Sequence, residues 1–164
     1  MPVGVISDTH GRLPSAILRA FEGVEAIIHC GDVGSDEVLN ELELIAPVKA
    51  VSGNVDGSPT KRMPLSRIEE FDGRIIAVTH GHLIQRPGSG LCAGLVEAFR
   101  ARRPAVICYG HTHRYAEEWI EGILVLNPGA VHRPRDGHFP SAAILTLKDN
   151  SILAARIMLD GRAC

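Results

Sequence analysis

The sequence predicts an α/β fold in a single domain that spans residues 1–164. Short apolar runs rich in β-branched residues recur along the chain, and runs of this length and composition are typical of strands. Segments with apolar residues at helical spacing separate the early runs, so the first two-thirds of the chain indicate crossover units and a largely parallel sheet. In the last third the strand patterns follow one another directly, which predicts a second, more antiparallel sheet.

Each expected element follows from its own pattern. The strands are expected at residues 2–6, 26–30, 47–51, 74–79, 104–109, 123–126, 142–147 and 152–158. Helices are expected where apolar residues form a stripe on one face. The stripes are Ile17, Leu18 and Phe21, then Val38, Leu39, Leu42 and Ile45, then Leu91, Leu95, Val96 and Phe99. Ser35 before Asp36 and Glu37 predicts a capped start of the second helix, with acids at the positive end of its dipole.

The composition excludes several classes of protein. Hydrophobic residues make up 45% and charged residues 22% of the chain, as in ordinary globular domains. A net charge of −2 and an aromatic content of 4% disfavour an extended nucleic-acid partner, which needs positive charge and stacking platforms. The chain has neither an apolar run long enough to cross a membrane nor a signal-peptide pattern at its start. We therefore expect a cytoplasmic protein that does not bind membranes.

The cysteines are expected to be reduced. Cys30, Cys92, Cys108 and Cys164 are scattered and form no C-x-x-C pair. Two of them, Cys30 and Cys108, fall within expected strands, where a free thiol behaves as a small apolar side chain. A disulfide framework is therefore not predicted.

Polar side chains that can bind metals follow five of the expected strands. They are Asp8, His10, Asp32, Asn54, His80, His111 and His113. Because the carboxyl ends of parallel strands share one edge of a sheet, we expect these side chains to meet in one crevice. Each short piece alone, such as a Gly-Asp dipeptide, is an ordinary turn signal. Their repeated order of strand and then ligand favours a metal site.

The chemistry of these ligands indicates the kind of ion and substrate. A mixture of imidazole and carboxylate suits manganese, iron, zinc, nickel or cobalt, and the lack of thiolates disfavours a closed structural zinc site. The candidates exceed what one ion needs and match two. With two carboxylates, two divalent ions leave a surplus of about two positive charges, which a hydroxide and an anionic phosphate ester would neutralise. Pairs of metal ions of this kind serve in-line displacement at phosphorus.

The motifs "DTH", "GD", "GNVD", "THGH" and "GHTH" resemble the five signature motifs of the calcineurin-like metallophosphoesterases. The resemblance runs from Val5 to about Arg135, and the short chain and "NPGAV" are similar to the small prokaryotic phosphodiesterase branch. It implies one calcineurin-like domain over residues 1–164. It also implies a four-layer αββα sandwich of two mixed sheets flanked by helices, with a dinuclear metal site at the sheet edge.

The resemblance also implies a role for each ligand. Asp8, His10 and His113 would bind the first ion, Asn54, His80 and His111 would bind the second, and Asp32 would bridge both. Mn²⁺ leads the candidates, followed by Ni²⁺, Fe²⁺, Zn²⁺ and Co²⁺. A metal-bridging hydroxide would attack phosphorus directly, so the expected activity is hydrolysis of small phosphodiesters. Asp32 and Asn54 would take part in catalysis as well as in metal binding.

One position departs from the family pattern. Many relatives have a histidine after the "GN" pair that protonates the leaving group, and this chain has Val55 there. Leaving groups that need no proton should therefore be favoured, unless another residue substitutes. The nearest substitute is His82, with a mere lining role in its loop as the alternative.

Other residues carry weaker expectations. His29 is expected to be a core histidine with a satisfied hydrogen bond. His132, His138, Arg133 and Arg135 are expected in an exposed turn, with a phosphate clamp as the second interpretation of the two arginines. Asn127-Pro128-Gly129 is expected to be a turn that shapes the site rather than a metal ligand.

Three functions from different classes remain at this point. The leading one is the phosphodiesterase. The second is a non-catalytic scaffold for protein–protein interaction, because the superfamily includes a retromer subunit that uses the fold in this way. The third, a nuclease, is disfavoured by the charge and the scarce aromatics. A homo-oligomer is a further expectation from family analogy.

Overall fold

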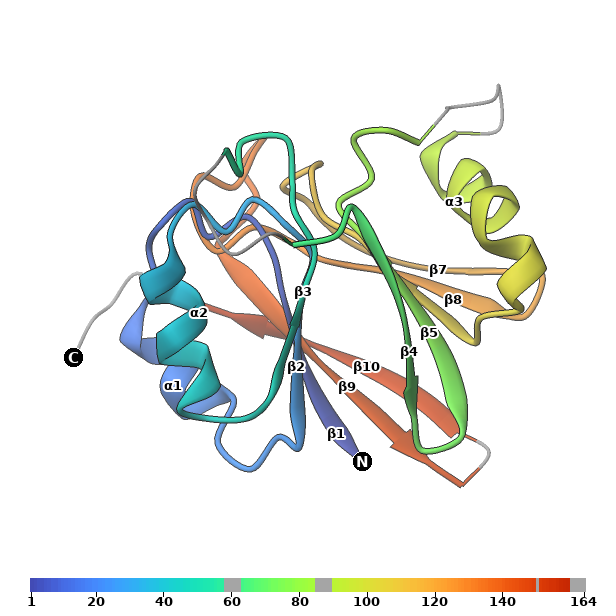
Figure 1. Cartoon of the computed structure of the whole chain (residues 1–164), viewed down its shortest axis with the longest axis horizontal. Helices are drawn as coiled ribbons and strands as arrows, with labels where there is room; N and C mark the ends of the chain where they lie inside the picture. The colour runs from blue at the N-terminus through green and yellow to red at the C-terminus, as the bar shows by residue number, and fades with distance from the viewer. Residues whose placement is uncertain (58–62, 85–89, 150, 160–164) are drawn as a thin grey trace.

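The computed structural model describes residues 1–57, 63–84, 90–149 and 151–159 of the chain. It contains two five-stranded sheets that pack face to face, with helices on both outer sides (Figure 1). Helices α1 (Ser15–Ala20) and α2 (Asp36–Glu43) lie on one side, and α3 (Leu91–Phe99), followed by the short 3-10 helix η1 (Arg100–Arg102), lies on the other. This is the predicted αββα sandwich.

Each sheet contains both parallel and antiparallel pairs. The first sheet has the order β10-β9-β1-β2-β3, with parallel pairing of β1 with β2 and of β2 with β3. Its strands are β1 (Pro2–Ile6), β2 (Ala26–His29), β3 (Val48–Ala50), β9 (Ser141–Lys148) and β10 (Ser151–Met158). The second sheet has the order β4-β5-β6-β8-β7, with parallel pairing of β5, β6 and β8. Its strands are β4 (Ser66–Phe71), β5 (Arg74–Thr79), β6 (Val106–Cys108), β7 (Tyr115–Ile120) and β8 (Ile123–Pro128).

Three apolar clusters hold the four layers together. One lies between the sheets, a second between the first sheet and α1 and α2, and a third between the second sheet and α3. The period-two alternation of strands explains how one strand serves two clusters. In β6, Val106 and Cys108 face the other sheet, whereas Ile107 packs toward α3. Burying each such aliphatic side chain contributes about 1.5–3 kcal/mol to stability.

The helices form where the apolar stripes predict them, with two local differences. Ile17 and Phe21 are buried, whereas Leu18 is 42% exposed because α1 is only six residues long. Helix α2 begins directly after Ser35 and carries Asp36 and Glu37 in its first turn, but the hydroxyl group of Ser35 makes no capping hydrogen bond.

The sequence patterns miss two strands and assign two others to the wrong sheet. The missed strands, β4 and β7, are the edges of the second sheet: β4 alternates exposed with half-buried residues up to buried Phe71, and β7 exposes Glu117, Glu118 and Trp119 in succession. The expected antiparallel sheet of the last third does not exist, because β9 pairs with β1 and extends the first sheet. Tertiary pairing with the start of the chain therefore decides where β9 and β10 lie.

The remaining structural expectations concern the cysteines and the membrane. Cys30 and Cys108 are free and fully buried between the sheets, as predicted, and Cys92 is free and half-buried. Cys164 lies outside the described residues. Within the described ranges, no helix is long and apolar enough to cross a membrane.

Candidate metal centre

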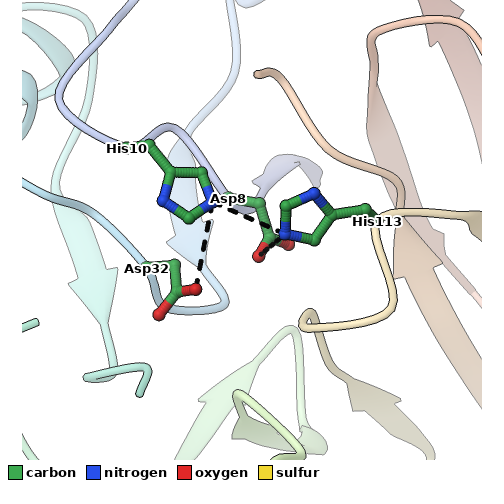
Figure 2. A group of neighbouring side chains, drawn as sticks. All are labelled: Asp8, His10, Asp32 and His113. Carbon is green, nitrogen blue, oxygen red and sulfur yellow. Dashed lines mark hydrogen bonds and ion pairs between the residues drawn. The ribbon is translucent and has the colours of Figure 1, made fainter. Parts of the chain in front are cut away.

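The candidate ligands gather where strands of both sheets end. Asp8 and His10 follow β1, Asp32 follows β2, and His113 lies in the segment after β6. Figure 2 shows these four side chains pointing toward one another from three separate loops. One potential ligand atom from each lies within 4.8 Å of those of the other three. We call these four residues the buried group.

The buried group is tightly packed. His113 Nε2 lies 3.1 Å from Asp8 Oδ1 and 3.5 Å from His10 Nε2. Asp8 is completely buried, and Asp32 and His113 are 3% and 7% exposed, so water is largely excluded from three of the four residues. These distances are compatible with ligand atoms that surround one ion.

The other three candidates, Asn54, His80 and His111, form the open group. Asn54 Oδ1 lies 3.2 Å from His80 Nε2 and 3.1 Å from His111 Nδ1. Asp32 connects the two groups, because its Oδ2 lies 3.9 Å from His10 Nε2 and 3.4 Å from His80 Nε2. The structure therefore brings all seven predicted ligands into one continuous cluster, with Asp32 between its halves.

The backbone at the ligands adopts a conformation that non-glycine residues rarely use. Five of the seven have a positive φ angle: Asp8 (55°), His10 (48°), Asp32 (54°), His111 (67°) and His113 (59°). Each such residue costs on the order of 1 kcal/mol or more and persists only where surrounding contacts impose it. Several such residues at one site indicate that the site needs this backbone geometry although non-glycine residues disfavour it.

Backbone carbonyls fix the orientation of two histidines. His80 Nδ1 donates to the Cys30 carbonyl at 2.8 Å, and His113 Nδ1 donates to the Arg133 carbonyl at 2.7 Å. Because a carbonyl only accepts, Nδ1 carries the proton and the neutral ring presents the lone pair of Nε2 to the cluster. Metal-binding histidines are usually oriented in this way.

The polar atoms of the cluster fit a cation better than they fit one another. Both carboxylate oxygens of Asp8 are buried, and neither has a hydrogen-bond partner among the residues that the structure describes. In the open group, the lone pairs of Asn54 Oδ1 and His80 Nε2 face each other at 3.2 Å. Buried acceptors without donors are costly, and a divalent metal ion satisfies them directly. The donor set of oxygen and imidazole nitrogen atoms therefore fits divalent metal ions.

The charges of the cluster shift its pKa values in opposite directions. Burial raises the pKa of Asp32, but the contact with His80 and the Val55 N–H group outweigh it and lower the pKa to about 2. Burial lowers the pKa of His80, but the carboxylates of Asp32 and Asp8 raise it by more. The Asp8 carboxylate likewise raises the pKa of His113. Because metal ligands must be deprotonated, any proton that these histidines carry at Nε2 is released when a metal ion binds.

Glycines allow the loops to approach closely. A Cβ atom at Gly53 would lie 2.0 Å from Asp32 Oδ1, and one at Gly110 would lie 2.1 Å from Ser7 Oγ. Both distances are far below contact, so no larger residue fits without moving the loops. The glycines of "GNVD" and "GHTH" are therefore required by packing.

A cleft of about 410 Å³ opens onto the cluster. Its lining residues are His10, Asp32, Asn54, Val55, His111, His113, Arg133, Pro134 and Arg135. Val55 is 50% exposed on this wall, as expected for the position where many relatives carry histidine. The two arginines are exposed, as expected, and also border the cleft.

His82 and His132 lie beside the cluster in different ways. The ring of His82 is 5.3 Å from that of His80 and 6.2 Å from that of His111, and its buried Nδ1 has no hydrogen-bond partner, but the residue does not line the cleft. His132, expected in an exposed turn, is half-buried, and its ring lies 6.4 Å from that of His10. His138 is also half-buried rather than exposed.

Further residues hold the ligand loops, and among them the sequence analysis gave such a role to Asn127 alone. The hydroxyl group of buried Thr9 accepts from His29 Nε2 at 3.0 Å and donates to the Val33 carbonyl at 2.9 Å. His29 Nδ1 accepts from the Gly31 amide at 3.2 Å, so His29 is a satisfied core histidine, as predicted. The hydrogen-bonding chain connects the loop after β1 with the loop after β2.

Asp56 and Asn127 complete this support. The two oxygens of Asp56 accept from the amides of Gly34 and Gly53, both at 2.8 Å. Asn127 Nδ2 donates to the Gly110 carbonyl at 2.8 Å and to the Thr112 hydroxyl at 3.1 Å. Asn127 thus shapes the site, as predicted, although Asn127 and Pro128 end strand β8 rather than forming a turn. In the sequence, the only indication of these roles is that Asp56 lies within "GNVD" and Asn127 within "NPGAV".

Comparison with known proteins agrees with this geometry. Residues 1–150 match the family model of the calcineurin-like phosphoesterase superfamily domain. The chain belongs to that superfamily. A probable metallophosphoesterase of Methanothermobacter thermautotrophicus is 36% identical over 166 residues, which cover 98% of this chain and 94% of that protein.

Two further similarities concern different members of the superfamily. A phosphodiesterase of Methanocaldococcus jannaschii is 35% identical over 147 residues, which cover 79% of this chain and 83% of that protein. The crystal structure of Vps29 from Entamoeba histolytica in complex with zinc has a TM-score of 0.79 and covers 96% of this chain and 99% of its own. Its sequence identity is 21%, so this second similarity concerns the fold alone.

Proposed function

We propose that the protein is a phosphodiesterase that hydrolyses small phosphodiesters with two divalent metal ions, Mn²⁺ being the first candidate. The observation that carries the proposal is the position of Asp32, whose Oδ2 lies between histidines of the buried and open groups. A single carboxylate shared by two sets of ligands is what a pair of ions requires. When bound, such ions polarise the phosphoryl oxygens and generate a hydroxide nucleophile at neutral pH.

The chain's own residues position and orient the reacting groups. Asp8, His10 and His113 would hold one ion, and Asn54, His80 and His111 the other. The Cys30 and Arg133 carbonyls fix two imidazole rings, and this limits reorganisation when substrate binds. The cleft is lined by residues of both groups and gives a phosphate ester access to them.

The absence of an imidazole at Val55 decides which substrates react well. In the described part of the cleft no acidic or imidazole side chain other than the proposed ligands lines the wall. A leaving group that departs as a stable anion needs no proton, so aryl and similarly activated diesters are the favoured substrates. Of the two roles open to His82, its ring contacts with His80 favour positioning of the open group.

The test is turnover of bis(4-nitrophenyl) phosphate by protein that is stripped of metal and reloaded with Mn²⁺. We expect activity that depends on the added metal and saturates at two ions per chain. Saturation at one ion would contradict the dinuclear assignment, and no turnover with any of the five candidate metals would contradict the enzymatic function.

The alternative is a non-catalytic scaffold for protein–protein interaction, which the fold similarity to Vps29 keeps in view. Seven chemically competent ligands in one cluster favour catalysis over this alternative. A scaffold would show metal binding without turnover, so the same assay separates the two functions.

Free buried cysteines are consistent with the cytoplasmic location that we propose. Sedimentation velocity would test the expected homo-oligomer.

A further inference from the structure

A second cavity adjoins the cleft over the metal cluster. It has a volume of about 360 Å³ and is lined by His111, Thr112, Arg114, Arg135 and Asp136. The two cavities share His111 and Arg135, so they form one groove with two chambers. A diester held at the cluster can therefore extend one of its arms past Arg135 into the second chamber.

The charges in this groove are unevenly paired. Arg114 forms an ion pair with Asp136 on the far wall of the second chamber. Arg133 and Arg135, in contrast, have no carboxylate within ion-pair distance among the residues that the structure describes. Elsewhere in the molecule, Arg67 and Arg74 are each held by a nearby acid. Arg135 thus presents an uncompensated guanidinium group where the two chambers meet.

The backbone that carries the arginines is anchored to the ligands. The Arg133 carbonyl accepts from His113 Nδ1 at 2.7 Å, and the Arg135 amide donates to the His113 carbonyl at 3.4 Å. The amide of His132, the residue before Arg133, donates to the Asp8 carbonyl at 3.1 Å. These bonds fix where the arginine Cα atoms lie relative to the cluster. Less conformational entropy is therefore lost when the arginines bind an anion.

We propose that Arg135 and the second chamber bind a second phosphate group, carried by the arm of the diester that remains on phosphorus. This inference rests on the proposed phosphodiesterase function and adds a substrate class to it. Two divalent ions and two carboxylates already leave a positive surplus that a hydroxide and the scissile phosphate neutralise. Arg133 and Arg135 add two positive charges, and a terminal phosphate carries nearly two negative charges at neutral pH. The departing arm would then occupy the first chamber, which is lined by Val55, whereas the second chamber is not.

A matched pair of substrates tests the inference. Thymidine 5′-(4-nitrophenyl phosphate) and its 3′-phosphorylated form have the same leaving group and differ by one phosphate on the retained arm. We expect kcat/KM to be about tenfold higher for the phosphorylated substrate, as one charge-assisted contact gives. Arg135→Gln should lower this preference to about one. Arg102→Gln removes the same charge from the exposed helix η1 and should keep the preference.

Binding provides a second readout that does not need turnover. Calorimetry should show thymidine 3′,5′-bisphosphate binding about tenfold more tightly than thymidine 5′-monophosphate, and Arg135→Gln should abolish the difference. The inference would be overturned if the extra phosphate changed neither kcat/KM nor the dissociation constant. It would also be overturned if Arg135→Gln lowered kcat/KM by the same factor for both substrates. If neither ester is hydrolysed, the proposed function fails, and calorimetry still decides the role of Arg135.

Discussion

The buried and open groups of the metal centre differ in both burial and backbone conformation. Asp8, Asp32 and His113 are at most 7% exposed, whereas Asn54 is exposed and His111 is half-buried. All four members of the buried group have a positive φ angle, but in the open group only His111 does. The protein imposes an unusual backbone on one half of the site, whereas the other half combines exposed Asn54 and half-buried His111 with fully buried His80.

This difference predicts that the two groups differ in metal affinity and in the rate of ligand exchange. A site that is fixed before the ion arrives costs little to order, so the buried group should bind its ion more tightly. Both groups border the cleft, but the open group does so through exposed Asn54 and half-buried His111 and should exchange ligands more readily. The two halves are joined through Asp32, so the sharpest tests remove this connection or change one half at a time.

The largest effect is expected from Asp32→Asn. The amide keeps the shape of the side chain but cannot balance two cations, so both halves should lose affinity. Changes in outer contacts of a metal ligand cost about 10–100-fold, and loss of the shared ligand should lower kcat/KM by more than about 10³-fold. Metal analysis after gel filtration should show fewer than two ions per chain. Near-normal turnover with two ions bound would contradict the bridging role.

Comparison of His113→Ala with His111→Ala tests the difference directly. His113→Ala should lower the affinity for the tightly bound ion, and His111→Ala the affinity for the weakly bound one. In the unchanged protein the two dissociation constants should differ by roughly 10-fold or more. Titration with a chelator, followed by metal analysis, measures both constants. If both variants empty the same ion, the assignment of the two histidines to separate halves is wrong.

Val55→His places an acid beside the open group. Proton donation to the leaving group contributes about 10²–10⁴-fold where it operates, so hydrolysis of an alkyl diester should rise by about 10²-fold in this variant. A nitrophenyl diester should change little, because nitrophenolate departs without a proton. The slope of log kcat/KM against leaving-group pKa is the measurement, and Val55→Gln is the control for size and polarity. A wild-type slope near zero would mean that an acid is already present.

His29, behind the buried group, predicts a pH dependence of stability. Burial lowers its pKa to about 4, whereas the unfolded chain has a value of about 6.5. The unfolded state therefore binds more protons between these pH values, so stability is complete above pH 6.5 and falls as the pH drops toward 4. The loss is about 3 kcal/mol at 1.4 kcal/mol per pKa unit. Urea denaturation of metal-free protein at several pH values should show a shallower dependence in His29→Gln.

His82→Ala should have the smallest effect. If His82 only supports His80 in the open group, turnover of aryl and alkyl diesters should fall by the same factor, about 10-fold or less. A loss confined to the alkyl substrate would instead identify His82 as the substitute acid. The ratio of the two rates decides between these outcomes without reference to absolute activity.

The two halves also differ from the rest of the fold in how well the sequence predicts them. The ligands follow from local order, because each comes directly after an apolar strand and parallel strands end at a common edge. Edge strands β4 and β7 lack this signal, because Glu70, Glu117 and Glu118 occupy exposed positions in them and interrupt the apolar pattern, and such charges disfavour pairing at sheet edges. The Asp72-Gly73 and Glu121-Gly122 turns, both with positive φ, were the available hairpin signals.

The partners of β9 and the supports of the ligands could not be predicted in this way. The choice between two sheets for β9 depends on packing of segments from opposite ends of the chain, which no local pattern encodes. Similarly, Asp56 and Asn127 act through hydrogen bonds to loops that are distant in sequence. Such contacts exist only once the layers are assembled.

The pairing of β1 with β9 has a consequence for synthesis on the ribosome. Asp8 and His10 leave the ribosome early, but β1, which carries them, has both of its neighbours only when Val3 can pair with Leu145. Translation proceeds at about 5–20 residues per second, so the first ligands wait many seconds for their final strand. Ions in the cell therefore meet a chain without a completed centre until the last sheet strands emerge, and metal loading is expected to be a post-translational event.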